Sequence, residues 1–137
     1  MPAPVENDAS ALASRYGMLG AVLGFLGVAA GAFGAHALKA TLVPAMMTVF
    51  ETAARYQLVH AVALVVVALA LERHVSRAWV VAGGLFAAGI VLFSGSLYAL
   101  ALTSVPAWGI VTPFGGLCLL AGWVSLATGF AAKRATA

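Results

Sequence analysis

The sequence has very few charged residues. Of its 137 residues only 8% are charged, with seven Lys and Arg against four Asp and Glu. Soluble domains carry about 25% charged residues. The chain is instead 64% hydrophobic, with a mean hydropathy of +1.07. Because so few charges cannot cover a water-facing surface, lipid must surround most of the chain.

Cysteine is equally scarce. Cys118 is the single cysteine and lies in an apolar run, which excludes an internal disulfide and a cysteine-based zinc site. We expect it to be a small buried side chain. The net charge of +3 comes from residues at segment ends, so there is no basic patch and we expect no nucleic-acid partner.

Long apolar runs are abundant. They predict an all-α integral membrane protein with four transmembrane helices in a compact bundle, because about 20 apolar residues span the hydrocarbon core of a bilayer. Pro44 is expected to open the second helix. Pro106 and Pro113 are expected to act as helix breakers in the turn between the third and fourth helices. The predicted organisation is a flexible tail at 1–14, a membrane domain at 15–132 with helices at about 15–38, 45–71, 78–102 and 114–131, and a basic tail at 133–137.

Glycine and other small residues recur at helical spacing in two of these segments. Such stripes let two backbones approach closely in lipid, where packing replaces the hydrophobic effect. We therefore predict two close helix contacts, while a glycine-lined space for a flat cofactor or lipid is the alternative. The stripes are Gly17, Gly20, Gly24, Gly27, Gly31 and Gly34 in the first segment, and Gly115, Cys118, Gly122, Ser125 and Gly129 in the fourth.

The basic residues predict the orientation. With four spans, both termini and the 72–77 turn share one side of the membrane, and most of the Lys and Arg residues lie there. Since cytoplasmic segments carry the excess of positive charge, both termini are expected in the cytoplasm. The residues on that side are Arg15, Arg73, Arg77, Lys133 and Arg134, against Lys39 and Arg55 on the other.

Polar residues of the spans converge on the outer half of the predicted bundle, and the inner half is expected to be dry. Ionisable groups within a span normally face the bundle interior or a partner. Glu51 and Arg55 are four residues apart in the order that favours an intrahelical ion pair. The cluster is either a small polar pocket or a structural clamp between helices. Its candidate members are His36, Glu51, Arg55, Tyr56, His60, Ser94 and Ser96.

The residue types offer little for catalysis or cofactor binding. His36 and His60 could ligate a haem from two helices, but their expected depths differ by several ångströms. Zinc lacks a third and fourth ligand. The Ser94-Gly95-Ser96 sequence is not a nucleophile elbow. We therefore expect no catalytic residues, no metal and no cofactor, and keep a haem-binding electron carrier as an alternative.

Four ordered motifs carry a family resemblance over about residues 15–131. The chain resembles the small four-span inner-membrane family typified by the bacterial YgdD and YwdK proteins, a domain of unknown function. The resemblance implies a multi-pass protein of the bacterial inner membrane and groups the candidate residues into one unit, but it implies no activity. The motifs are GAFGAHALK at 31–39, ETAARYQLVHA at 51–61, LFSGSLYALAL at 92–102 and TPFGGLCLLAGW at 112–123.

The function expected from these observations is a non-enzymatic accessory or ligand-binding membrane protein. Its expected partners are membrane lipid and either further copies of the chain or another membrane protein. The principal alternative is a minimal oligomeric transporter or proton-coupled channel, with Arg55 and His60 at its constriction.

Overall fold

A computed structural model describes residues 4–135, with side chains for residues 10–34 and 36–132. All regular structure in this part of the chain is helical, and four units are long and apolar enough to cross a membrane, which confirms the predicted all-α, four-span class. The elements are α1 (Pro4–His36), the 3-10 turn η1 (Leu38–Ala40), α2 (Pro44–Arg73), α3 (Arg77–Gly89), the π-helical segment η2 (Ile90–Ser94), α4 (Gly95–Thr103) and α5 (Trp108–Ala135).

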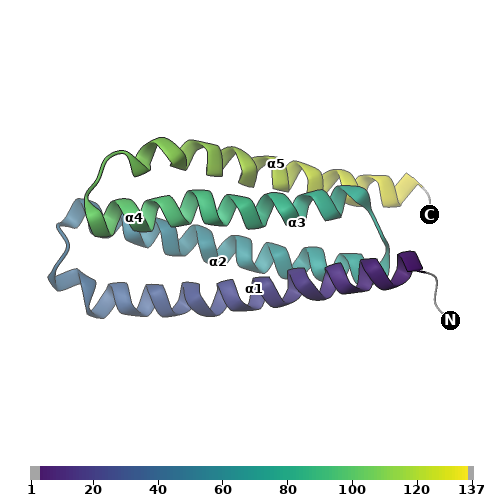
Figure 1. Ribbon diagram of the computed structural model, residues 1–137, viewed down its shortest axis with the longest axis horizontal. Helices are drawn as coiled ribbons and strands as arrows, with labels where there is room; N and C mark the ends of the chain where they lie inside the picture. The colour runs from purple at the N-terminus through teal and green to yellow at the C-terminus, as the bar shows by residue number, and fades with distance from the viewer. Residues whose placement is uncertain (1–3, 136–137) are drawn as a thin grey trace.

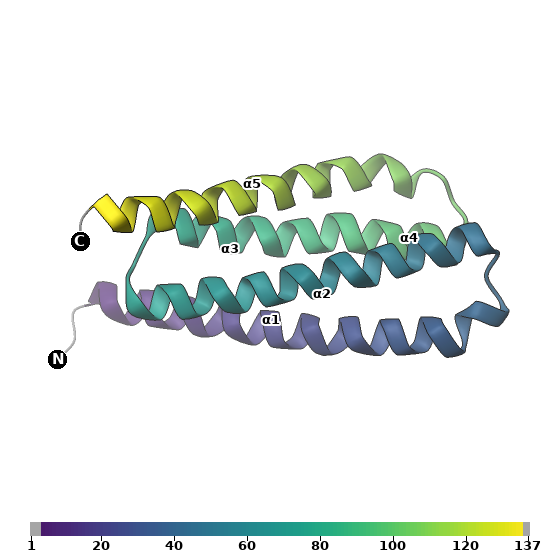
Figure 2. The ribbon, with the colours of Figure 1, turned by 180° about the vertical axis from the view of Figure 1, so that it is seen from behind.

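The four spans run up and down in chain order (Figure 1). α3, η2 and α4 follow one another without a break and form the third span. Both termini lie at one end of the molecule, here called the terminal end, and the connections at 37–43 and 104–107 lie at the other, the loop end (Figures 1 and 2). The predicted placement of both termini and the 72–77 turn on one side is therefore correct.

The bundle is more open than predicted. α1 packs mainly on α2, α2 on the third span, and the third span on α5. α1 and α5 thus flank a central pair of helices (Figure 2). Each outer helix covers one side of that pair only, which leaves grooves between α2 and α5 and between α1 and the third span.

The helix ends extend beyond their predicted bounds. α1 begins at Pro4, so residues 4–14 continue the helix, where a flexible tail was predicted. Proline is tolerated in a first turn, and the alanine-rich residues that follow are good helix formers. α5 continues to Ala135; residues 1–3 and 136–137 of the predicted tails lie outside the described part.

The fourth span starts earlier than predicted, because Pro113 lies inside α5 and does not end the preceding turn. The first turn is tight, with the amides of Trp108 and Gly109 donating to the carbonyls of Val105 and Pro106. Without an N–H, Pro113 leaves the Gly109 carbonyl without its helical partner. The missing hydrogen bond lies in the second turn of the helix, near the loop end, and does not interrupt α5.

The glycine stripe of α1 packs against α2 of the same chain. A Cβ added at Gly20 would lie 2.8 Å from the Ala61 carbonyl oxygen, and one at Gly27 would lie 2.8 Å from the Leu58 side chain. Gly31 is the exception, with nothing within 4 Å. The stripe therefore serves tight helix packing, as predicted, although an apolar groove of about 330 Å³ runs beside Gly20 and Gly24.

The small-residue stripe of α5 packs in the same way against the third span. Gly115 meets the backbone at Leu92 and Phe93, within η2, so closely that no side chain fits. Gly122 and Gly129 receive the rings of Phe86 and Trp79. Both predicted close contacts are thus present, and the second brings α5 against the π-helical segment.

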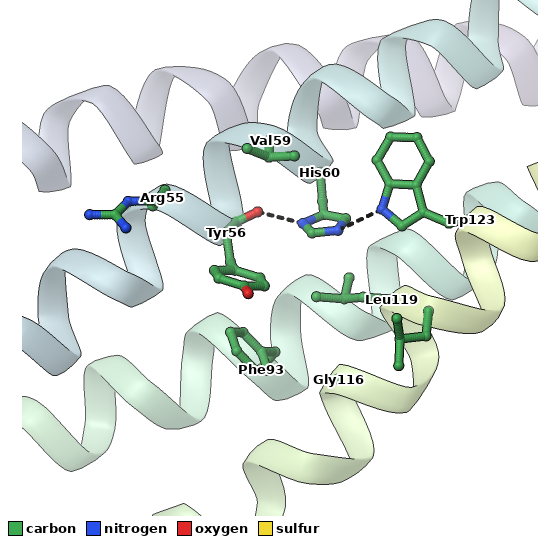
Figure 3. Close-up of a pocket in the computed structure, with 9 residues that line it drawn as sticks. Arg55, Tyr56, Val59, His60, Phe93, Gly116, Leu119 and Trp123 are labelled. Atoms are coloured by element: carbon green, nitrogen blue, oxygen red, sulfur yellow. Dashed lines mark hydrogen bonds between the residues drawn. The ribbon is translucent and has the colours of Figure 1, made fainter.

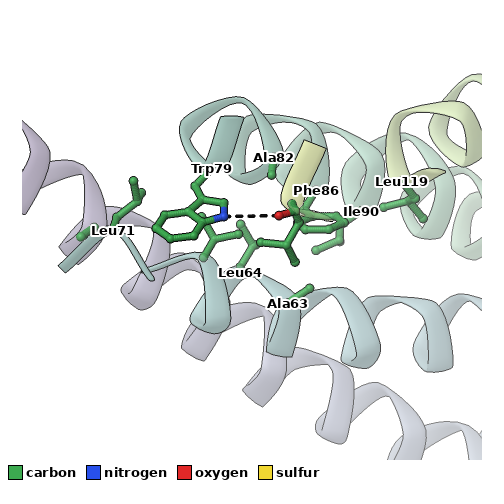
Figure 4. Close-up of a cluster of buried hydrophobic side chains, with 11 residues drawn as sticks. Ala63, Leu64, Leu71, Trp79, Ala82, Phe86, Ile90 and Leu119 are labelled. Atoms are coloured by element: carbon green, nitrogen blue, oxygen red, sulfur yellow. Dashed lines mark hydrogen bonds between the residues drawn. The ribbon is translucent and has the colours of Figure 1, made fainter. Parts of the chain in front are cut away.

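The main core lies towards the terminal end, around Trp79 and Phe86 (Figure 4). The Trp79 indole N–H donates to the Leu126 carbonyl at 3.3 Å. The Tyr16 hydroxyl donates to the Val80 carbonyl at 2.9 Å, and the Ser125 hydroxyl to the Ala78 carbonyl at 2.8 Å. The half next to the termini was predicted to be dry, and that prediction is wrong: these three polar groups lie there, each bonded to a backbone carbonyl of a neighbouring helix.

Candidate functional site

A groove of about 460 Å³ lies between α2 and α5, and Phe93 of η2 lines it (Figure 3). Its wall is mainly apolar and aromatic, and the one charged side chain in it belongs to Arg55. A concave apolar site with a few polar groups is the usual form of a small-molecule site. The groove is lined by Arg55, Tyr56, Val59, His60, Phe93, Gly116, Leu119, Leu120 and Trp123.

His60 forms the floor of this groove and is 4% exposed. Its Nε2 lies 3.1 Å from the Trp123 indole nitrogen, and its Nδ1 lies 2.7 Å from the Tyr56 carbonyl oxygen. An indole N–H only donates, so Nε2 must accept and Nδ1 must carry the proton. These partners fit a neutral imidazole with both nitrogens satisfied, and they tie α2 to α5.

Aromatic rings line the groove on either side of His60. Tyr56 lies with its ring centroid 4.6 Å from that of Phe93 and 5.9 Å from that of His60. Trp123 meets His60 edge-on at 5.9 Å, and Phe86 packs behind both. The Tyr56 side chain is still 42% exposed, so one aromatic face of the groove is open to whatever surrounds the protein.

The predicted Glu51–Arg55 ion pair is not formed. Both side chains are exposed, and within the described part of the chain no carboxylate lies within ion-pair distance of the Arg55 guanidinium. The Arg55 side chain extends along α2, away from His60 and Trp123 (Figure 3). The spacing places the two side chains within reach of each other. In an exposed pair, however, the small Coulomb energy gained does not offset the conformational entropy that two long side chains lose.

The two serines of the predicted cluster have different surroundings. Ser96 donates to the Phe93 carbonyl at 3.0 Å and shares a 2.8 Å hydrogen bond with the Thr112 hydroxyl, so it ties α4 to α5. Ser94 is 1% exposed and its hydroxyl has no partner. Ser94 faces the groove on the other side of the central helix pair, apart from Arg55, Tyr56 and His60.

His36 lies apart from the other members, at the last residue of α1, and is exposed. Gly24 of α1 lies opposite Ala61, the residue next to His60 in α2, so His60 and Gly24 lie at about the same height along the bundle axis. His36 is then about 18 Å further along the axis, at 1.5 Å per residue. The two histidines therefore cannot ligate one iron within a single chain. The structure brings Arg55, Tyr56 and His60 together, and leaves His36 and Glu51 outside.

Three residues of these grooves were missing from the predicted cluster. Trp123 supplies the hydrogen bond to His60, and Phe93 supplies a wall. Gln57 is buried and donates from its side-chain amide to the Leu23 carbonyl of α1 at 2.8 Å. The sequence could have indicated Trp123 and Gln57, because an indole or amide N–H inside an apolar span needs a hydrogen-bond acceptor.

The groove has neither a metal-binding cluster nor a thiol among the described residues. No group of three His, Cys, Asp or Glu side chains able to hold a metal ion occurs among the described residues. Both nitrogens of His60 are already engaged, and Cys118 is partly buried on α5 and does not line the groove.

Comparison with known proteins agrees with this fold. No solved structure matches the chain. The family model described as "Protein of unknown function (DUF423)" matches residues 30–116. The UPF0382 inner membrane protein YgdD of Escherichia coli strain K12 is 41% identical over 119 residues, which cover 86% of this chain and 91% of that protein.

A UPF0382 membrane protein of Staphylococcus haemolyticus is 42% identical over 110 residues, covering 80% of this chain and 88% of that protein. One from Staphylococcus epidermidis is 43% identical over the same length. The relatives are named as membrane proteins, in agreement with the four apolar spans. On these grounds the chain is a multi-pass membrane protein that belongs to the DUF423 family.

Proposed function

We propose that this chain is a non-enzymatic membrane protein that binds an anionic amphiphile, a membrane lipid, in the groove between α2 and α5. The observation that carries the proposal is Arg55. Its guanidinium is exposed at the rim of an apolar, aromatic groove, with no carboxylate beside it in the described part of the chain. A phosphate or carboxylate headgroup would supply the missing negative charge.

The position of Arg55 along α2 fits a headgroup. Glu51 and Glu72 are about 31 Å apart along the helix, at 1.5 Å per residue, which matches a hydrocarbon core of about 30 Å. Arg55 is the one charged residue between them. It lies about one turn inside the level of Glu51, and its long side chain can extend to the interface while its stem stays in lipid.

The groove itself suits an acyl chain. Its walls are Leu119, Leu120 and Val59 with the rings of Tyr56 and Phe93, and the exposed face of Tyr56 continues from the rim towards the floor. The hydrogen-bonded His60–Trp123 pair closes the floor and joins the two helices. A lipid would therefore bind with its headgroup at Arg55 and one chain along the groove.

The orientation belongs to the same proposal. The terminal end carries Arg15, Arg73 and Arg77 along with the basic residues near the C-terminus, while the loop end carries Lys39. The excess of positive charge favours a cytoplasmic terminal end, which would place Arg55 and the groove mouth in the outer leaflet. Reporter fusions at the two ends test this: activity of a cytoplasmic reporter at the loop end would reverse it.

Native mass spectrometry of the protein in nanodiscs tests the binding. With phosphatidylglycerol and phosphatidylcholine offered together, the wild type should retain the anionic lipid. Arg55→Gln should lose that preference, and Lys39→Gln, which removes an exposed cation of the loop end outside the groove, should keep it. Equal lipid retention by Arg55→Gln and the wild type would contradict the proposal.

A second variant tests the groove without touching the charge. A Cβ at Gly116 would make ordinary contacts of 3.7 and 3.8 Å with the Phe93 ring, so Gly116→Leu should fold and fill the groove. It should lose bound lipid while Arg55 remains in place. Undiminished retention would show that the lipid binds elsewhere.

A further inference from the structure

A second groove lies on the opposite side of the central helix pair, between α1 and the third span. Its volume is about 510 Å³, within the range of ligand sites. It is lined almost wholly by apolar side chains from α1, α2, η2 and α4, and three of its residues are polar: Gln57, Ser94 and Tyr98.

Two hydroxyls of this groove have no hydrogen-bond partner: Ser94 Oγ and Tyr98 Oη. Both oxygens are covered by neighbouring atoms, and an unpaired buried hydroxyl costs free energy in an apolar environment. Several other hydroxyls of the spans are paired within their own helix. Thr52 and Thr103, for example, donate to the carbonyl four residues earlier at 2.9 and 2.6 Å.

Ser94 lies at the end of the π-helical segment. The carbonyl four residues before Ser94 belongs to Ile90, and it accepts the amide of Gly95, five residues on. π-helical turns of this kind occur frequently at functional sites. Ser94 and Tyr98 are four residues apart and so lie one turn apart on one face of the third span.

The depth of the two hydroxyls indicates which ligand oxygen they meet. The Tyr98 ring packs on Phe50, with centroids 4.9 Å apart, which places Tyr98 level with the Glu51 turn and so at the edge of the hydrocarbon core. Ser94 lies about 6 Å deeper. Ester carbonyls of a glycerolipid occupy this level, at the boundary between headgroup and acyl chains, and they accept hydrogen bonds without donating.

We infer that the groove between α1 and the third span binds a diacyl glycerolipid, with Ser94 and Tyr98 donating hydrogen bonds to its ester carbonyls and Leu23, Leu26 and Val91 contacting its chains. Because both oxygens are covered, neighbouring side chains must shift slightly for the lipid to reach them. This site does not depend on the headgroup, so it is independent of the Arg55 groove.

A competition between ester and ether lipids tests the inference. Diacyl phosphatidylcholine and its dialkyl ether analogue share a headgroup and differ in mass, so native mass spectrometry reads both occupancies in one spectrum. The wild type should prefer the diacyl lipid by about tenfold, and Ser94→Ala or Tyr98→Phe should each reduce that preference by about threefold or more, the effect of one hydrogen bond. Equal binding of the two lipids by the wild type would overturn the inference.

Ser96→Ala is the matched control. It removes an equally buried hydroxyl from the same helix, but one that already has protein partners. The ester preference should be unchanged in this variant. Loss of preference in Ser96→Ala to the same extent as in Ser94→Ala would show that the third span is merely perturbed, and would also overturn the inference. Because both lipids are zwitterionic, the result is distinct from that of the Arg55 experiment.

Discussion

The two halves of the bundle differ in how completely their polar groups are paired. In the terminal half, Tyr16, Trp79 and Ser125 each donate to a carbonyl on a neighbouring helix. In the loop half, Arg55 has no carboxylate beside it, and the Ser94 and Tyr98 hydroxyls have no partner among the described residues. The polar groups of the terminal half thus hold helices together, whereas in the loop half some do so, such as the Ser96–Thr112 pair, and others remain available to a ligand.

The packing follows the same division. The larger core cluster surrounds Trp79 and Phe86 towards the terminal end, and the smaller one is built on Met47, Phe50 and Ala101 near the loop end. Interior packing and satisfied hydrogen bonds stabilise a fold, whereas concave surfaces with unpaired donors bind ligands. Four sets of variants can break or sharpen this comparison.

The largest effect is expected from the terminal core. Trp79→Ala removes a side chain that is 1% exposed and should lower the free energy of unfolding by about 3 kcal/mol, since a large cavity is left. Trp108→Ala, at an indole that is 43% exposed, should cost less than about 0.5 kcal/mol. Reversible unfolding in mixed micelles measures both. Similar losses at the two sites would contradict the assignment of the core.

The next effect concerns the glycine stripe. Gly20→Ala places a Cβ against the Ala61 carbonyl and the Val65 and Leu64 side chains, and should cost about 2 kcal/mol through overpacking. Gly31→Ala meets nothing within 4 Å and should stabilise the helix by up to about 1 kcal/mol. The same unfolding assay applies. A destabilising Gly31→Ala would indicate that this glycine contacts another chain.

A double-mutant cycle measures the hydrogen bond that joins α2 to α5. Trp123→Phe and His60→Leu should be coupled by about 1 kcal/mol, the net contribution of one buried hydrogen bond. The cycle of Trp123→Phe with Tyr56→Phe is the control and should be additive, because no hydrogen bond joins those two side chains. Additive losses in the first cycle would show that the His60–Trp123 contact contributes no free energy.

The smallest effect compares two tyrosines, one in each half. Tyr16→Phe removes a hydroxyl bonded to the Val80 carbonyl and should cost about 1 kcal/mol. Tyr98→Phe removes an unpaired hydroxyl, so in delipidated protein it should be neutral or slightly stabilising. Unfolding midpoints of the two variants test the contrast. It would fail if Tyr98→Phe were the more destabilising of the two.

The sequence predicted the fold at the level of spans and stripes. Runs of apolar residues identified four helices, and the spacing of Gly20, Gly24 and Gly27 identified a face for close packing. The spacing could not say which helix packs there. That depends on how each helix is rotated about its axis, and every apolar span in this chain offers several faces of similar hydropathy.

The site was predicted only in part, for the same reason. Arg55, Tyr56 and His60 share one helix, so their proximity followed from spacing alone. The pairing of His60 with Trp123 depends on contacts across helices, and the unpaired Ser94 hydroxyl lies in a π-helical segment that spacing does not predict. The Glu51–Arg55 prediction was wrong because spacing places two charges within reach without deciding whether the side chains meet.

The π-helical segment also has a consequence for chain length. Its backbone bonds run from residue i to i+5, so η2 accommodates one residue more than a regular helix would between the same two ends. A one-residue deletion within 90–94 would restore regular helix and leave α3 and α4 facing their present partners. The same deletion elsewhere in the third span would rotate one part against the other by about 100°. The third span can therefore shorten by one residue at η2 without losing its register against α2 and α5.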